Sequence, residues 1–79
     1  MTNLEKYTNA FTETFEISAE QAEKLEYQSI DQWDSIGHMT LIAAIEDAFE
    51  IMMDTDDIID FSSFEKGKEI LKKYDVTVE

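Results

Sequence analysis

Three side chains that could do chemistry stand close together near the middle of the chain: Asp34, Ser35 and His38. A hydroxyl, an imidazole and a carboxylate are the parts of a serine nucleophile with its general base. If the segment is helical, however, Ser35 and His38 lie on the same helical turn. Asp34 then cannot reach the imidazole nitrogen that faces away from the serine, as a catalytic triad requires. We therefore expect no catalytic residues and no enzymatic activity. We expect His38 to lie on the surface or to face a partner.

The pair Asp34 and Ser35 allows two other interpretations. Both residue types are preferred at the N-cap of a helix, so the pair could simply begin one. Alternatively, an exposed serine at a helix start could carry a covalent group through a phosphodiester, because the free amides and the positive helix end favour an anion. Gly37, a poor helix residue, would let another backbone or a bound arm lie close. The residue types leave both interpretations open.

An aspartate-rich run from Asp54 to Asp60 resembles the beginning of a calcium loop. An EF-hand needs glycine at its sixth position and a bidentate glutamate at its twelfth. Counted from Asp54, the twelfth residue is Glu65, but the sixth is Ile59, whose β-branched side chain disfavours the sharp turn. We expect no metal site here, and a degenerate calcium-binding protein is the weaker alternative.

The composition excludes several further classes of function. The 79 residues include 19 acids and six bases, all of them lysine, for a net charge of −13. The length allows one domain, 1–79. This charge would be repelled by nucleic acid and by anionic membranes. The absence of cysteine excludes a disulfide framework and a thiolate zinc site. With neither arginine nor a glycine-rich loop, we expect no nucleotide site.

The distribution of charge indicates where partners would bind. Eleven acids and no lysine lie between Leu25 and Glu65, which favours a surface that meets basic partners, although a merely solvated face fits equally well. The residues from Met1 to Lys6 lack the basic and apolar regions of a secretory signal. No apolar run approaches the roughly 20 residues that span a bilayer. We expect a cytoplasmic monomer without stable membrane insertion.

A hydrophobic period near 3.6 predicts an all-α fold. The predicted helices are 3–15, 19–24, 35–49, 56–61 and a last helix that starts at the capping box 62–65. Capping boxes are expected at Thr2, Ser18 and Ser62. The short helix 56–61 should turn Ile58, Ile59 and Phe61 inward. The result is a small bundle of three longer and one or two short helices.

The segment from Trp33 to Phe49 resembles the signature of the acyl carrier protein family, which includes the peptidyl and D-alanyl carriers. The signature is Asp-Ser followed by a large aliphatic residue and an amphipathic helix that ends in acids and a phenylalanine. Asp34-Ser35-Ile36 and Ile45-Glu46-Asp47-Ala48-Phe49 match it, and the segments 57–58 and 61–64 resemble the family's third and fourth helices. The resemblance therefore covers essentially the whole chain. It implies a small four-helix acyl-carrier-like bundle with a long loop between helices one and two and a short third helix.

The resemblance also implies a function. Ser35 would carry 4′-phosphopantetheine, attached by a phosphopantetheinyl transferase that uses coenzyme A. The arm's thiol would hold an acyl or aminoacyl group as a thioester, so the working thiol would be imported into a chain without cysteine. Partners would be an acyl- or aminoacyl-activating enzyme and a downstream synthase or transferase. Gly37 and His38 after Ile36 resemble specialised carriers of secondary-metabolite or cell-surface polysaccharide pathways, rather than housekeeping fatty-acid carriers.

Other residues receive roles by the same resemblance. Asp34 would help position the transferase's metal or fix the helix start. The partner-facing residues would be Ile36, Gly37, Met39, Glu46 and Asp47, with the two acids meeting basic patches. The main alternative is an acidic helical interaction module without a prosthetic group, in which Ser35 is only a cap.

Overall fold

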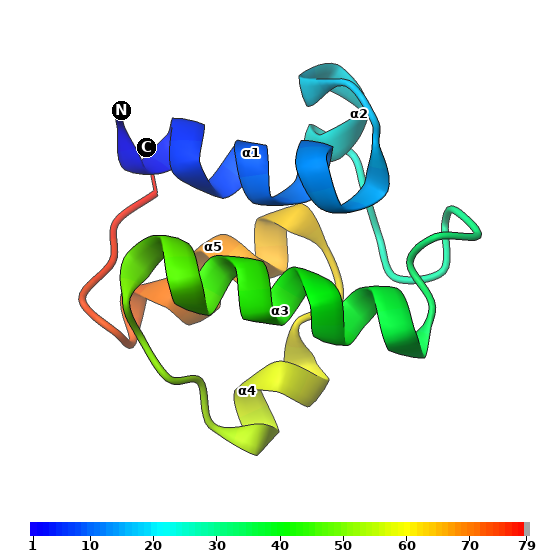
Figure 1. The fold of residues 1–79 in the computed structure, drawn as a ribbon. Coiled ribbons are helices and arrows are strands. Elements are labelled where there is room, and N and C mark those ends of the chain that lie inside the picture. Colours follow the sequence, from blue (N-terminus) through cyan, green and yellow to red (C-terminus); the bar gives the residue numbers. More distant parts are fainter. Residues whose placement is uncertain (79) are drawn as a thin grey trace.

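The computed structural model describes residues 1–78 and arranges them as five helices (Figure 1). These are α1 (Asn3–Phe15), α2 (Ala19–Glu23), α3 (Ser35–Phe49), α4 (Thr55–Asp60) and α5 (Phe64–Lys72). The described part contains no strand, only an isolated bridge between Glu26 and Ser63. The predicted all-α bundle of three longer and two short helices is confirmed. None of the helices in the described part is both long and apolar enough to cross a membrane.

Capping boxes begin the first two helices, as predicted. The Thr2 hydroxyl accepts a hydrogen bond from the Glu5 amide, and the Glu5 carboxylate accepts one from the Thr2 amide. Ser18 and Gln21 make the same reciprocal pair at α2. Each box satisfies two amides that a helix start leaves without intrahelical partners. The sequence therefore fixes these two boundaries by local chemistry.

The predicted cap of α5 was wrong by one residue. Ser63, not Ser62, is the N-cap, and its hydroxyl accepts from the Lys66 amide at 3.0 Å. The Ser62 carbonyl instead accepts from the Tyr27 amide at 2.8 Å. This contact holds the segment before α5 in an extended pairing with the long connector, so the helix begins after Ser63.

Aromatic rings fill the interior between α1, α3 and α5. The largest fully buried side chains include Tyr7, Phe11, Phe15, Trp33, Phe61 and Phe64. The Phe11 ring lies at the centre, with its centroid 5.1 Å from those of Tyr7 and Phe64 and 5.7 Å from that of Trp33. The Tyr7 hydroxyl donates to the Phe64 carbonyl at 2.6 Å, and burial raises the pKa of Tyr7 far above its usual value. The hydroxyl therefore stays protonated and ties α1 to α5.

The short helix α4 begins and ends one residue earlier than predicted, and one of its side chains has another orientation. Ile58 is half-buried and Phe61 is fully buried, but Ile59 is 71% exposed. Residues 58 and 61 are three apart and share a face, whereas residue 59 is rotated by about 100° from residue 58. The expectation that Ile59 points inward was therefore wrong. Asp57 takes a buried position instead, four residues before Phe61 on the same side.

A hydrogen-bonded cluster fastens α4 to the end of α5. The Asp57 carboxylate accepts from the Tyr74 hydroxyl at 2.6 Å and from the Lys73 ammonium at 2.9 Å. The Tyr74 hydroxyl also accepts from the Asp54 amide at 2.9 Å. These bonds hold the pKa of Asp57 below its usual value, first through the Tyr74 hydroxyl and then through Lys73. Asp57 therefore remains a carboxylate although it is only 7% exposed.

Candidate functional site

Asp34 and Ser35 have different positions at the start of α3. Asp34 is the N-cap, and its Oδ1 atom accepts from the Gly37 amide at 2.8 Å. Ser35 is the first helical residue, and its side chain is exposed. Within residues 1–78 the Ser35 hydroxyl makes no hydrogen bond. Asp34 therefore performs the capping, and the Ser35 hydroxyl is left free to react.

The backbone around Ser35 also offers hydrogen-bond donors. The His38 amide donates to the Asp34 carbonyl at 2.8 Å, as expected in a first helical turn. The amides of Ser35 and Ile36 bond to no protein group in the described part of the chain. Two free amides and the positive end of a 15-residue helix therefore lie beside an accessible hydroxyl. An anion attached to that hydroxyl would meet favourable electrostatics.

Gly37 makes room for the chain's own backbone. A Cβ atom at Gly37 would overlap the carbonyl oxygen of Gln32 and would stand 3.2 Å from the Phe15 ring. The connector before α3 can therefore pass close to the helix only because residue 37 has no side chain. The close approach expected at this glycine is found within the molecule. Contact between Gly37 and a partner stays a prediction.

His38 differs from its expected place on the surface. It is half-buried, and its Nδ1 atom accepts from Trp33 Nε1 at 2.9 Å. Its Nε2 atom lies 2.7 Å from the Ile58 carbonyl oxygen. A carbonyl oxygen can only accept, so Nε2 carries the proton and the neutral tautomer satisfies both contacts. His38 therefore joins the connector and α4 to α3, and neither ring nitrogen is available as a general base.

Exposed apolar side chains follow Ser35 on α3, and another lies on α4. Ile36 is 79% exposed and Met39 is 53% exposed on α3, and Ile59 is 71% exposed on α4. Contiguous apolar patches are typical of interaction surfaces, whereas single exposed apolar side chains are common on any protein. A shallow recess of about 250 Å³ lies between the connector, α3 and α4, lined by Tyr27, His38, Ile59 and Phe61. The expected exposure of Ile36 and Met39 is found, and their contact with partners stays a prediction.

The two acids assigned to partners have different surroundings. Glu46 is half-buried, and its Oε2 atom accepts from the Met53 amide at 2.9 Å. This bond holds the segment that follows α3 against the helix. Asp47 is exposed and makes no side-chain hydrogen bond within residues 1–78. Asp47 is thus free to meet a basic partner, while Glu46 already has a structural role.

The aspartate-rich run does not form a calcium loop. Its residues from Thr55 to Asp60 are helical, and the Asp57 carboxylate is bound by Tyr74 and Lys73. In residues 1–78 no three His, Asp or Glu side chains gather into a group that could hold a metal ion. An EF-hand needs its ligands on one wrapped loop, so the observed helix disfavours that alternative.

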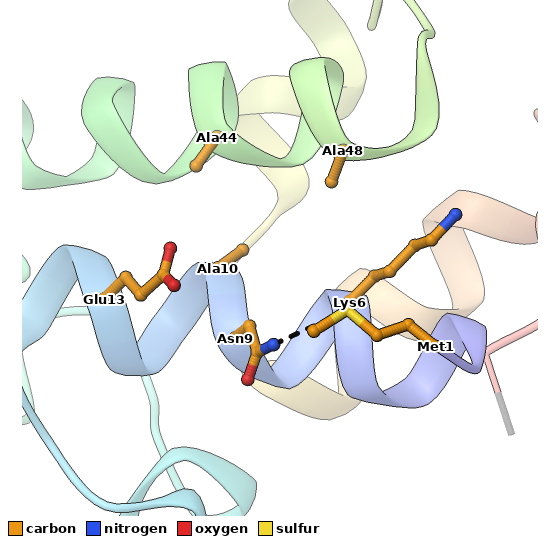
Figure 2. A pocket seen from close by; sticks show the side chains of 7 residues that line it. All are labelled: Met1, Lys6, Asn9, Ala10, Glu13, Ala44 and Ala48. Atoms are coloured by element: carbon orange, nitrogen blue, oxygen red, sulfur yellow. Dashed lines mark hydrogen bonds between the residues drawn. The ribbon is translucent and has the colours of Figure 1, made fainter.

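A groove that was not predicted from the sequence runs between α1 and α3. It has a volume of about 300 Å³. Figure 2 shows Ala10 of α1 facing Ala44 and Ala48 of α3, with Lys6 and Glu13 standing on α1 at either side. The three small side chains allow the two helices to lie close together. The groove is therefore explained by helix packing.

Comparisons of the chain with protein-family models, with curated protein sequences and with solved structures find no match. Function is therefore inferred from the arrangement of residues at the start of α3.

Proposed function

We propose that this chain is a carrier protein of the acyl carrier type, with 4′-phosphopantetheine attached to Ser35. The observation that carries the proposal is the division of roles between two adjacent residues. Asp34 caps α3 through the Gly37 amide, so the helix does not need the Ser35 hydroxyl, which is exposed and unbonded in the described part of the chain. When bound, the arm would supply a thiol that holds an acyl or aminoacyl group as a thioester.

In the attachment step this chain would supply only the nucleophile, the Ser35 hydroxyl. Ser35 Oγ would attack the phosphorus of coenzyme A that bears the pantetheine arm. The new O–P bond forms as the P–O bond to adenosine 3′,5′-bisphosphate breaks, and the serine proton leaves to a base. Both nitrogens of His38 are already engaged by Trp33 and Ile58. The base would therefore come from the phosphopantetheinyl transferase, consistent with a carrier that is not itself an enzyme.

The start of α3 fits the phosphodiester that this step would create. The amides of Ser35 and Ile36 and the positive helix end favour an anion at this place. Asp34 uses Oδ1 for the cap, and Oδ2 makes no hydrogen bond within residues 1–78. This second oxygen would be available to a metal ion brought by the transferase. Asp34 would then cap α3 through Oδ1 and assist loading through Oδ2.

The surface around Ser35 supports a role in presenting cargo to several enzymes. Ile36 and Met39 are exposed apolar side chains close to the attachment site, and Asp47 is an exposed acid further along α3. Acids steer a small carrier toward basic patches at high encounter rates, and a limited apolar contact permits rapid release. We propose that an activating enzyme and a downstream synthase or transferase bind here, in a specialised biosynthetic pathway.

The proposal is tested by intact-mass spectrometry after incubation with coenzyme A and a broad-specificity phosphopantetheinyl transferase. The native chain should gain one phosphopantetheine, and Ser35→Ala should gain none. Ser62→Ala, which removes another exposed hydroxyl that makes no hydrogen bond within residues 1–78, should load like the native chain. A folded native chain that gains no mass with any of several transferases would favour an acidic interaction module without a prosthetic group.

A further inference from the structure

The His38 imidazole connects three parts of the molecule. It belongs to α3, one turn after Ser35, and it accepts from Trp33 at the end of the connector. Through Nε2 it donates to the Ile58 carbonyl of α4 at 2.7 Å. Its ring also lies nearly parallel to that of Trp33, with centroids 6.1 Å apart and an interplanar angle of 16°. The His38 side chain therefore links the connector and α4 to α3.

The helix α4 depends on such links for its position. It has six residues, and an isolated helix of that length is not stable in water. Phe61 anchors one end in the core, and Asp57 bonds to Tyr74 and Lys73. The bond from His38 to Ile58 connects α4 directly to the helix that carries Ser35. Without this bond, α4 would keep its anchors to the core and to α5 but lose its hydrogen bond to α3.

Two surface features beside His38 depend on the placement of α4. Ile59, the residue after Ile58, presents an exposed apolar side chain. The recess of about 250 Å³ is bounded by His38 from α3, Ile59 from α4 and Tyr27 from the connector. An enzyme that docks over Ser35 would therefore meet a surface built from both helices, and its shape depends on the bond between them.

We propose that His38 is a positioning residue for loading at Ser35, acting through its hydrogen bond to the Ile58 carbonyl. This inference rests on the proposed carrier function and adds a residue to it. His38 would touch neither coenzyme A nor the reacting hydroxyl. It would keep α4 in the arrangement that the transferase recognises.

The expected kinetic effect follows from the fraction of carrier molecules in which α4 has the position that the transferase recognises. If α4 samples other positions, only a fraction of the carrier molecules is competent to bind, and the apparent affinity falls by that fraction. Chemistry at Ser35 is unchanged once the complex has formed. Loss of the bond should therefore raise KM for the carrier and leave kcat nearly constant. One hydrogen bond corresponds to roughly a tenfold change.

Two substitutions separate the two bonds of His38. A Gln side chain can place its amide nitrogen near the position of Nε2, so His38→Gln keeps a donor for Ile58 and loses the acceptor for Trp33. An Asn side chain is shorter and can place an acceptor near the position of Nδ1, so His38→Asn keeps Trp33 and loses Ile58. Replacement of Trp33 is not a matched control, because its indole is fully buried against Phe11 and Phe15 and a smaller ring would leave a cavity in the core.

The experiment measures the steady-state kinetics of loading by the transferase, with the carrier as the varied substrate. His38→Asn should raise KM about tenfold with kcat within about twofold of native. His38→Gln should remain within about twofold of the native KM. The proton NMR signal of Trp33 Nε1–H should stay in its hydrogen-bonded position in the Asn variant and shift in the Gln variant.

The outcomes distinguish this inference from the function on which it rests. A native chain that accepts no phosphopantetheine would contradict the carrier function itself. If the native chain is loaded but the Asn and Gln variants have equal KM values, the positioning role is refuted. A fall in kcat with unchanged KM in the Asn variant would also refute it, because that pattern means a role in the chemical step.

Discussion

The Asp34 carboxylate accepts a hydrogen bond from the Gly37 amide at 2.8 Å. This bond makes Asp34 the cap of α3, and it leaves Ser35 as the first helical residue with an exposed hydroxyl. From composition alone, either residue could have been the cap. The structure assigns that role to the aspartate, which is why a second role for the serine is a reasonable proposal.

Substitutions of Asp34 should separate its capping role from its charge. Asn caps a helix about as well as Asp, whereas loss of the cap costs about 1 kcal/mol. Asp34→Asn should therefore keep the urea midpoint of unfolding, and Asp34→Ala should lower it. If the second carboxylate oxygen assists a metal ion during loading, both variants should be loaded more slowly. Normal loading of the Asn variant would restrict Asp34 to capping.

Gly37→Ala should destabilise the protein even though alanine is the better helix former. The added methyl group would overlap the Gln32 carbonyl oxygen and approach the Phe15 ring. Overpacking of this kind costs about 1–3 kcal/mol, which exceeds the roughly 1 kcal/mol that alanine gains by helix propensity. Urea unfolding followed by circular dichroism measures the difference. Thr40→Ala, at an exposed position of the same helix, should change stability by far less.

An increase in stability for Gly37→Ala would contradict this account. It would mean that the connector can move away from α3 without cost. The close approach of Gln32 would then be no reason for a glycine.

Acid should reduce the stabilisation that the Asp57 carboxylate gives to the folded protein. Its pKa is lowered in the folded protein by the Tyr74 hydroxyl and then by Lys73, so the folded state binds this proton less tightly than the unfolded chain. The stabilisation is complete above the ordinary aspartate pKa of about 4, and it is lost as pH falls through the lowered value. Asp57→Asn should therefore unfold at a lower urea concentration than native at pH 7. The difference in urea midpoint between the native chain and Asp57→Asn should be smaller at pH 3 than at pH 7.

The matched control for this experiment is Asp56→Asn. Asp56 is exposed in the same first turn of α4, so both substitutions remove one charge from the same helix end. The control should show a smaller loss at pH 7 and no comparable narrowing in acid. A gap between native and Asp57→Asn that stays constant from pH 7 to pH 3 would refute the role assigned to the ionised carboxylate.

Glu46 and Asp47 should respond differently to substitution. Glu46→Ala removes the acceptor of the Met53 amide, and we expect a loss of about 1 kcal/mol in the free energy of unfolding. Asp47→Asn should leave stability nearly unchanged and should reduce kcat/KM for loading at low salt, because it removes only a steering charge. Measuring both quantities for both variants tests the assignment. Equal stability losses would show that Asp47 also has a structural partner.

Local chemistry explains why most of the fold was predictable. Thr2 precedes a 13-residue helix and Ser18 a five-residue one, and in both cases the helix start follows from the capping box. Weak local signals explain the errors. Ile59 lies in a six-residue helix that is too short to reveal its period, and Ser62 and Ser63 are equal candidates until the Tyr27 amide engages one carbonyl.

The helix start at Asp34 and Ser35 was predictable because the pair and the helix after it form a local pattern. The role of His38 was not, because it depends on a carbonyl 20 residues away in another helix. Every residue has a backbone carbonyl, so the sequence does not indicate which one His38 contacts. Glu46 was missed as a structural residue for the same reason, since its partner is the Met53 amide.

The central claim is that the Ser35 hydroxyl, freed from capping by Asp34, receives the prosthetic group. The most direct test is site-resolved mass spectrometry of the native chain after incubation with coenzyme A and a phosphopantetheinyl transferase. The account predicts a single phosphopantetheine on the peptide that contains Ser35, with fragment ions that place it on that residue. A folded chain that remains unmodified, or one modified at another hydroxyl, would contradict the claim.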